Sequence, residues 1–258
     1  MRYFSNSQDD LDLVELEPVP ETEKAHTAPG DSLSFDGLED RRFEVLAYKL
    51  TAAEPGGARA HLMSGVRDKG RDIIVYSDAG KLVAIKQCKK YRDRLDEPTV
   101  RREMLKLAIH SYREPAILGS GPVVYELWCP GGLFETAESL FLEWPNRWTE
   151  MLLASDAAKV LREYAAFGEL VWDDVKEYIV TKFPRIVTPG RLGALDISGR
   201  VRNHPTIFEE FFQVTSVMRT QDVRDFFSQL GIAELTDDHG RHVLGRIKQF
   251  PPEQRLVA

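Results

Sequence analysis

The chain has 258 residues, of which 43% are apolar and 29% charged, and its formal net charge is −7. These totals predict a globular protein with one large domain, or one domain with an appendage. No apolar run approaches the roughly 18 residues of a membrane-spanning helix. The acidic N-terminus lacks the apolar region of a secretory signal, and Cys88 and Cys129 are too few for a disulfide framework. We therefore expect a cytoplasmic protein.

Acidic residues are concentrated at the N-terminus. Residues 1–40 hold two basic and eleven acidic residues, a net charge of −9, which leaves the rest of the chain at +2. Within that rest, residues 59–113 hold fourteen basic and seven acidic residues, a net charge of +7. The net acidity of the chain therefore does not exclude a nucleic-acid partner, because this stretch can attract phosphates.

The first elements are a tail, a helix and three strands. Residues 1–34 mix acidic residues with prolines and show little periodicity, so we predict a flexible acidic tail. Apolar residues then recur at helical spacing from about Asp36 until just before Pro55. Three apolar, largely β-branched segments at 59–63, 72–76 and 82–85 predict strands. The turn residues 78–80 join the last two of these strands as a tight hairpin.

A second helix is predicted from about 98 to 111, with Pro98 in its first turn. A strand at 123–128 and a helix at 134–142 follow. This order predicts an α/β fold whose restriction-endonuclease-like core has a central mixed β-sheet flanked by helices, over residues 35–143. From Trp144 onward the pattern is mostly helical, which indicates a helical extension or connector over residues 144–258. Its predicted helices span 150–167, 172–181, 206–217 and 220–230, with a break rich in proline and glycine at 184–205.

Candidate catalytic residues lie around the predicted hairpin. Because side chains alternate along a strand, Gln87 and Lys89 point to one face and Cys88 to the other. Asp72 opens the neighbouring strand, where its carboxylate can lie beside Gln87 and Lys89. The Asp72 carboxylate, the Gln87 amide oxygen and the Cys88 backbone carbonyl are oxygen ligands suited to Mg²⁺. Lys89 can orient or deprotonate water or neutralise charge at a phosphate, and Glu44 on the first helix can reach the metal directly or through water.

These residues resemble a known family. The segments Phe43-Glu44, Gly70-Arg71-Asp72-Ile73 and Ile85-Lys86-Gln87-Cys88-Lys89-Lys90-Tyr91 are similar to the PD-(D/E)xK nuclease superfamily. The most similar branch is that of the Mrr-like restriction endonucleases and the Cap4-type nuclease domains of antiviral systems. Residues 124–137, a strand, two glycines and the start of a helix, also resemble this branch, so the resemblance covers about residues 36–143.

The resemblance implies DNA cleavage that depends on Mg²⁺, for which Mn²⁺ can substitute. It implies metal binding by Asp72 and Gln87, catalysis by Lys89 and a supporting acid at Glu44. Gln87 departs from the general motif, which has a carboxylate there, although the Mrr-like branch is similar to this chain in using glutamine. A neutral ligand weakens metal binding, which makes Glu44 more important.

Basic residues around the hairpin are candidates for phosphate contact. They would position a nucleic-acid backbone and not read its bases. The candidates are Arg67, Lys69, Arg71, Lys90, Arg101, Arg102 and Lys106.

Two readings of function stay open on the sequence alone. The first is a DNA endonuclease of antiviral defence or restriction, whose activity is gated by a sensor or oligomerising partner, in a larger chain or as a separate subunit, and which acts as a homo-oligomer. The second is a catalytically inactive nucleic-acid-binding module or a scaffold subunit of a defence complex, which the glutamine at position 87 favours. Apart from either function, a purely structural reading is that Asp72 caps the turn after Gly70 and that Lys89 is a solvated strand end. A winged helix-turn-helix after residue 220 is a further, weaker alternative.

Overall fold

The computed structural model describes residues 24–27, 32–55, 59–63 and 69–214. The chain divides into two compact units, one of residues 1–25 and 31–212, the other of residues 26–30 and 213–258. The sheet and the candidate site belong to the first unit. Most of the predicted acidic tail, the loop residue Arg67 and the predicted helix at 220–230 lie outside the described residues.

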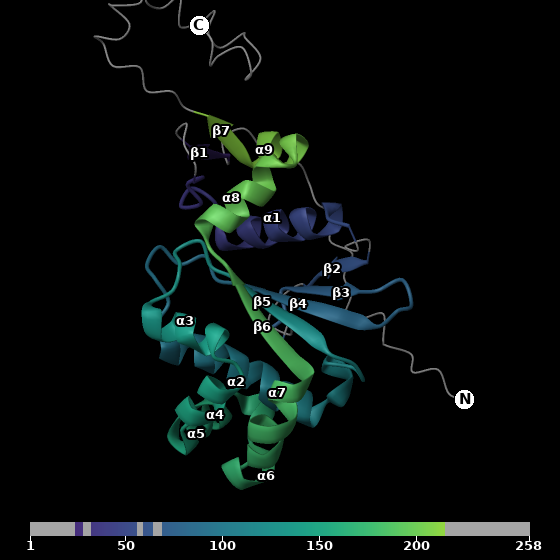
Figure 1. Cartoon of the computed structure of the whole chain (residues 1–258), viewed down its shortest axis with the longest axis vertical. Coiled ribbons are helices and arrows are strands. Elements are labelled where there is room, and N and C mark those ends of the chain that lie inside the picture. The colour runs from purple at the N-terminus through teal and green to yellow at the C-terminus, as the bar shows by residue number, and fades with distance from the viewer. Residues whose placement is uncertain (1–23, 28–31, 56–58, 64–68, 215–258) are drawn as a thin grey trace, which may run out of the picture. The chain divides into compact units, whose positions relative to one another are not determined.

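A five-stranded mixed sheet forms the centre of the first unit (Figure 1). The three N-terminal strands pair antiparallel, and the last two add to them in parallel. The predicted α/β class with a mixed sheet is therefore confirmed. In sheet order the strands are β2 (Ala60–Leu62), β3 (Ile73–Tyr76), β4 (Leu82–Cys88), β5 (Val123–Trp128) and β6 (Val187–Leu192).

The tight connection between β3 and β4 sets the register of the site. Gly80 adopts a φ of 71°, a left-handed conformation that glycine adopts without a steric penalty. The Gly80 amide donates to the Ser77 carbonyl at 2.8 Å, and the Ser77 amide donates to the Lys81 carbonyl at 2.8 Å. The predicted hairpin is thus confirmed, and it pairs Ile73 with Lys86.

Helices cover both faces of the sheet (Figure 1). One buried apolar cluster joins the sheet to α1 (Asp40–Ala53), α8 (Ala194–Arg202) and α9 (Pro205–Phe211). A second cluster on the opposite face joins it to α2 (Glu97–Arg113), α3 (Glu135–Leu142), α4 (Asn146–Met151), α5 (Ala154–Glu163), α6 (Trp172–Glu177) and α7 (Phe183–Ile186). Ile85 belongs to the second cluster and Cys88 to the first, as the predicted alternation along β4 requires.

Several shorter elements complete the described chain. Two single-turn 3₁₀ helices span Pro115–Ile117 and Ala165–Phe167, and a π-helical turn at Tyr178–Lys182 links α6 to α7. The strands β1 (Ala25–Thr27) and β7 (Phe212–Val214) form a separate two-stranded sheet. Among the described residues, no helix has the length and apolar character needed to cross a membrane.

The second helix follows from its sequence signals. The side chain of Asp96, at its N-cap, accepts a hydrogen bond from the Thr99 amide at 3.0 Å, which satisfies one of the free amides of the first turn. Pro98 lies in that first turn, where its missing N–H costs nothing. The helix buries Val100, Met104 and Leu107 against the sheet.

The segment after residue 143 differs from the expected helical pattern. The proline- and glycine-rich break contributes β6, which pairs in parallel with β5. Pro189 is accommodated because β6 is the outermost strand of the five, where a missing N–H need not interrupt a ladder. The expected helix at 150–167 is divided into α4, α5 and a 3₁₀ turn, and the helix expected at 206–217 ends at Phe211.

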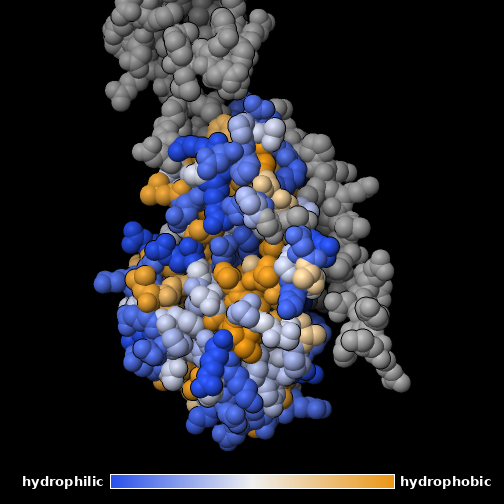
Figure 2. Space-filling view, turned by 45° about the vertical axis from the view of Figure 1, so that its right-hand side comes forward, coloured by the Kyte–Doolittle hydropathy of each residue, from blue (hydrophilic) through white to orange (hydrophobic). Residues whose placement is uncertain are grey.

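The face drawn in Figure 2 is largely hydrophilic, with an apolar stretch across its middle.

Candidate active site

The four predicted catalytic residues line one cavity of about 160 Å³. Glu44 comes from α1, Asp72 from the residue before β3, Gln87 from β4, and Lys89 from the residue after it. The remaining lining residues are Asp40, Phe43, Cys88, Lys90 and Tyr91. Residues from separate elements therefore meet at the end of the hairpin, where the sequence pattern places them.

Asp72 is held by backbone and side-chain hydrogen bonds. Its amide donates to the Lys86 carbonyl at 3.0 Å, and its carbonyl accepts from the Met63 amide at 2.8 Å, so it bridges the strands on either side. Its Oδ2 accepts hydrogen bonds from the Cys88 amide at 2.5 Å and from Gln87 Nε2 at 3.0 Å. Asp72 as a whole is only 4% exposed. Because both donors belong to β4, the carboxylate has a defined orientation toward that strand.

The amide oxygen of Gln87 is a buried acceptor without a donor. Gln87 is 4% exposed, and its Oε1 has no hydrogen-bond partner among the described residues. Leaving a buried polar atom unpaired costs about 1–3 kcal/mol, so such atoms are rare in folded proteins. A cation or an ordered water beside Gln87 would satisfy Oε1. The Gln87 side chain therefore has an oxygen that can still accept a hydrogen bond or bind a cation.

The oxygen atoms around the cavity fit a hard divalent cation. Asp72 and Glu44 provide carboxylates, and Gln87 provides the orphaned amide oxygen. The Cys88 amide faces Asp72, and its carbonyl points to the same side because both groups of one strand residue face the same neighbour. Within the described ranges, no cluster of three His, Cys, Asp or Glu side chains could hold a metal ion. A cation here would consequently need the neutral oxygens as well as the two carboxylates.

Glu44 is fixed by an arginine of its own helix. Arg41 Nη1 lies 2.6 Å from Glu44 Oε2 and also donates to the Met63 carbonyl at 2.9 Å. The Glu44 side chain is 25% exposed, so water reaches it. Arg41 thus connects the acid on α1 to the segment that leads into the hairpin.

Lys89 is paired with an acid that the sequence reasoning missed. Lys89 Nζ lies 3.2 Å from Glu103 Oε2, and Lys106 Nζ lies 2.8 Å from the other oxygen of Glu103. Burial lowers the pKa of Lys89, but the charge and hydrogen bond of Glu103 outweigh it and the net shift is upward. Burial likewise raises the pKa of Glu103, and the two lysines reverse that shift. The one signal in the sequence is an acid between basic residues, three positions before Lys106, on a helix that packs against the sheet.

The thiol of Cys88 is buried and unreactive. Burial, followed by the negative charges of Asp72 and Glu44, raises its pKa well above the usual range. The thiol lies in the cluster beneath α1 and therefore on the opposite face of β4 from Gln87. Cys88 can contribute its backbone groups to the cavity, but its sulfur is not a nucleophile at neutral pH.

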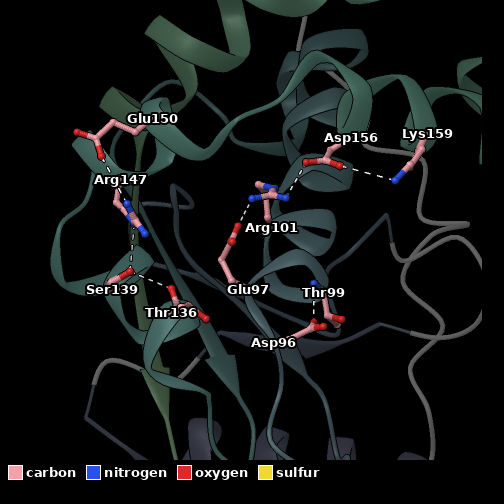
Figure 3. Close-up of polar contacts among 10 residues, drawn as sticks. All are labelled: Asp96, Glu97, Thr99, Arg101, Thr136, Ser139, Arg147, Glu150, Asp156 and Lys159. Carbon is pink, nitrogen blue, oxygen red and sulfur yellow. Dashed lines mark hydrogen bonds and ion pairs between the residues drawn. The ribbon is translucent and has the colours of Figure 1, made fainter.

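The predicted phosphate-binding residues have different surroundings. Lys90 lines the cavity beside the four central residues. Arg101 is 7% exposed; its Nη2 contacts Asp156 Oδ2 at 2.6 Å and its Nη1 contacts Glu97 (Figure 3). Arg101 therefore ties α2 to α5, with its charge balanced by two carboxylates.

The other candidates are nearer the solvent but also have partners. Lys69 pairs with Glu114 at 2.6 Å, and Arg102 pairs with Glu163 at 2.8 Å. Lys106 pairs with Glu103 and also lies 5.1 Å from the centre of the Tyr164 ring. Arg71 also has an interaction partner. Of the described residues in this set, Lys90 is the one that lines the cavity.

No protein-family model, curated protein or solved structure matches the chain.

Proposed function

We propose that the chain is a metal-dependent endonuclease that hydrolyses phosphodiester bonds in DNA. One observation carries this proposal: Glu44, Asp72, Gln87 and Lys89 line a single cavity, and the buried Oε1 of Gln87 has no hydrogen-bond partner among the described residues. Two acids, a neutral oxygen and a lysine are the groups needed to hold a divalent cation and to stabilise negative charge on a phosphate.

The order and pairing of the elements support a restriction-endonuclease-like core of the PD-(D/E)xK kind. A helix precedes three antiparallel strands, and a second helix connects them to a parallel strand. The motif residues lie on the central hairpin of this arrangement, and the supporting acid lies on the first helix. The proposed core comprises α1 through α3, and β6 extends its sheet by one strand.

Each residue has a defined part in the proposed reaction. When bound, Mg²⁺ or Mn²⁺ would polarise the phosphate and lower the pKa of a coordinated water. Asp72, Gln87 and the Cys88 carbonyl would hold the cation, and Glu44 would complete the ligands directly or through water. Lys89, held at 3.2 Å by Glu103, presents a positive charge to the phosphate oxygens as negative charge develops on them.

Cleavage of a supercoiled plasmid tests the proposal. In Mg²⁺ the wild-type chain is expected to nick or linearise the plasmid, and EDTA is expected to abolish the reaction. Lys89→Ala should slow cleavage at least about 10²-fold, the usual contribution of a positioned acid, base or charge. Lys159→Ala is the matched control, because the Lys159 side chain is 66% exposed and its partner Asp156 is on α5. Full activity of Lys89→Ala would contradict the proposal.

The same assay addresses the second candidate function. Retention of the plasmid without cleavage in Mg²⁺ or Mn²⁺, and unaffected by EDTA, would favour a nucleic-acid-binding module. The observation behind this alternative is that Gln87 Nε2 donates to Asp72, a contact that a purely structural polar network would also contain.

We also propose that the nuclease is gated, as an effector of antiviral defence or restriction. Because an ungated nuclease would damage its own cell, a sensor or a second copy of the chain is expected to switch it on. Assembly into a homo-oligomer would bring two cavities to one DNA molecule. Full plasmid cleavage by a species that light scattering shows to be monomeric would refute gating by assembly.

A further inference from the structure

A second cavity adjoins the proposed active site. It also measures about 160 Å³ and is lined by the segment 33–36, the loop 90–92 and Gly131, among others. Lys90 and Tyr91 line both cavities, so the two are neighbours along the loop that follows the motif lysine. A volume of this size holds about five water molecules, which suits a phosphate group with part of its hydration shell.

Two cations at this cavity can reach a phosphate. Lys90 Nζ contacts the Asp36 backbone carbonyl at 3.5 Å, and no carboxylate pairs with it among the described residues. The Arg92 side chain is 86% exposed and lies 3.8 Å from the Asp36 carboxylate, which is itself 64% exposed. Pairs this long and exposed contribute little and are easily exchanged. An incoming phosphate can therefore replace Asp36 as the partner of Arg92.

An aromatic ring lies between these two cations in the sequence. Tyr91 is 49% exposed, so its ring is accessible from solvent. Its backbone is closely packed: a Cβ added at Gly131 would lie 2.4 Å from the Tyr91 carbonyl oxygen and 2.7 Å from that of Asp93. Gly131 thus permits a tight approach that supports the loop while the Tyr91 side chain stays accessible.

We propose that Lys90, Tyr91 and Arg92 bind an unpaired nucleotide next to the scissile phosphate, so that the substrate is a single strand or a strand with an unpaired stretch. Lys90 and Arg92 hold its phosphate in the second cavity, and its base stacks on the Tyr91 ring. Cations that follow a backbone, interleaved with an aromatic ring that takes a base, are the combination that binds single strands. In a duplex the bases stack on one another and leave no free face for the ring. This inference rests on the proposed function, because it places the nucleotide beside the cavity of Asp72 and Lys89.

Binding of labelled oligonucleotides tests the inference independently of cleavage. Fluorescence anisotropy is measured for the full chain with a fluorescein-labelled single strand and with the blunt duplex of the same sequence, in EDTA and in Ca²⁺. Tyr91→Ala is expected to weaken single-strand binding about 5- to 150-fold, and Tyr91→Phe, which keeps the ring, to change it less than about 2-fold. Neither change should affect duplex binding. Lys90→Ala should reduce the slope of log K for single-strand binding against log salt concentration by about 0.7. Asp36→Asn should tighten single-strand binding.

The outcomes separate this inference from the nuclease proposal. Cleavage by the wild type, together with single-strand binding unchanged by Tyr91→Ala, would overturn the inference and leave the nuclease intact. Binding that depends on Tyr91 without any cleavage, even where the chain is assembled, would support the inference and count against the nuclease. Equal weakening of duplex and single-strand binding in Tyr91→Ala would also overturn it, as would a failure of the wild type to bind either oligonucleotide. Circular dichroism of each variant confirms that it is folded.

Discussion

Replacing Glu103 with glutamine should both destabilise the fold and release Lys89. Glu103 is 11% exposed and pairs with two lysines whose side chains are 19% and 17% exposed. Removing one partner from a buried ion pair costs about 3–5 kcal/mol, because the remaining charge is left uncompensated. Since both lysine side chains retain some contact with water, we expect the lower end, about 3 kcal/mol. For a unit of this size, that corresponds to a melting temperature lower by about 6–12 °C.

Urea unfolding followed by circular dichroism measures this loss, and an exposed pair between the same helix and α5 provides the control. Arg102 and Glu163 are 49% and 45% exposed, so Glu163→Gln should cost less than about 1 kcal/mol. A Glu103→Gln variant as stable as Glu163→Gln would refute the reasoning, because it would show that solvent screens the Glu103 pairs and that they do not position Lys89.

The gap in the free energy of unfolding between wild type and Glu103→Gln should also depend on pH. The folded state lowers the pKa of Glu103, since its two lysines outweigh burial. The stabilisation is then fully present above the unfolded pKa, near 4.5, and is lost as the pH falls through the lower pKa of the folded state. The gap between the two proteins should stay constant from pH 6 to pH 9 and shrink below about pH 4.5. A gap that grows on acidification would contradict the assignment.

Three further outcomes follow from the contacts described above. Gly131→Ala should lower the free energy of unfolding by about 1–3 kcal/mol in thermal melts, because the added Cβ would meet the backbone oxygen of Tyr91 at 2.4 Å. Gly121→Ala, the control, has open space around it and should leave the stability nearly unchanged. Burial, followed by nearby basic side chains, lowers the pKa of His110 from 6.5 to about 4. Unfolding measured at a series of pH values should therefore show the wild type losing stability from pH 6.5 toward pH 4, and His110→Gln losing less. Gln87→Glu replaces the amide donor to Asp72 with a second carboxylate, so the variant should have a lower melting temperature than wild type in EDTA. When the Mg²⁺ concentration reaches roughly 100 times the variant's dissociation constant for Mg²⁺, its free energy of unfolding should rise by about 3 kcal/mol. An identical Mg²⁺ response in the two proteins would count against a cation at this cavity.

Local sequence patterns were sufficient to predict the hairpin core. The strand pair, the turn at Gly80 and the helix that begins beside Asp96 depend on residues close in sequence, so periodicity and turn chemistry identify them. Strand β6 was missed because its Pro189 and Gly190 disfavour a strand unless it lies at the edge of a sheet. That position is a property of the assembled sheet and is not visible in the six residues themselves.

The candidate site was predictable to the same extent. Asp72, Gln87 and Lys89 meet because alternation and the hairpin register are local properties. Glu103 was missed because its contact with Lys89 requires α2 to pack across the end of β4. The burial of Arg101 was equally hidden, since its partner Asp156 lies 55 residues further along the chain. Contacts between distant segments determine which charged residues are satisfied and which can meet a ligand.

The central claim is that the cavity of Asp72 and Gln87 holds a divalent cation. Isothermal titration of Mg²⁺ into the wild-type chain, Asp72→Asn and Gln87→Ala tests it directly and needs no substrate. We predict one Mg²⁺ site in the wild type, lost in Asp72→Asn and weakened in Gln87→Ala, where the orphaned oxygen is removed. Heats of binding that are absent in the wild type, or unchanged in both variants, would contradict the claim.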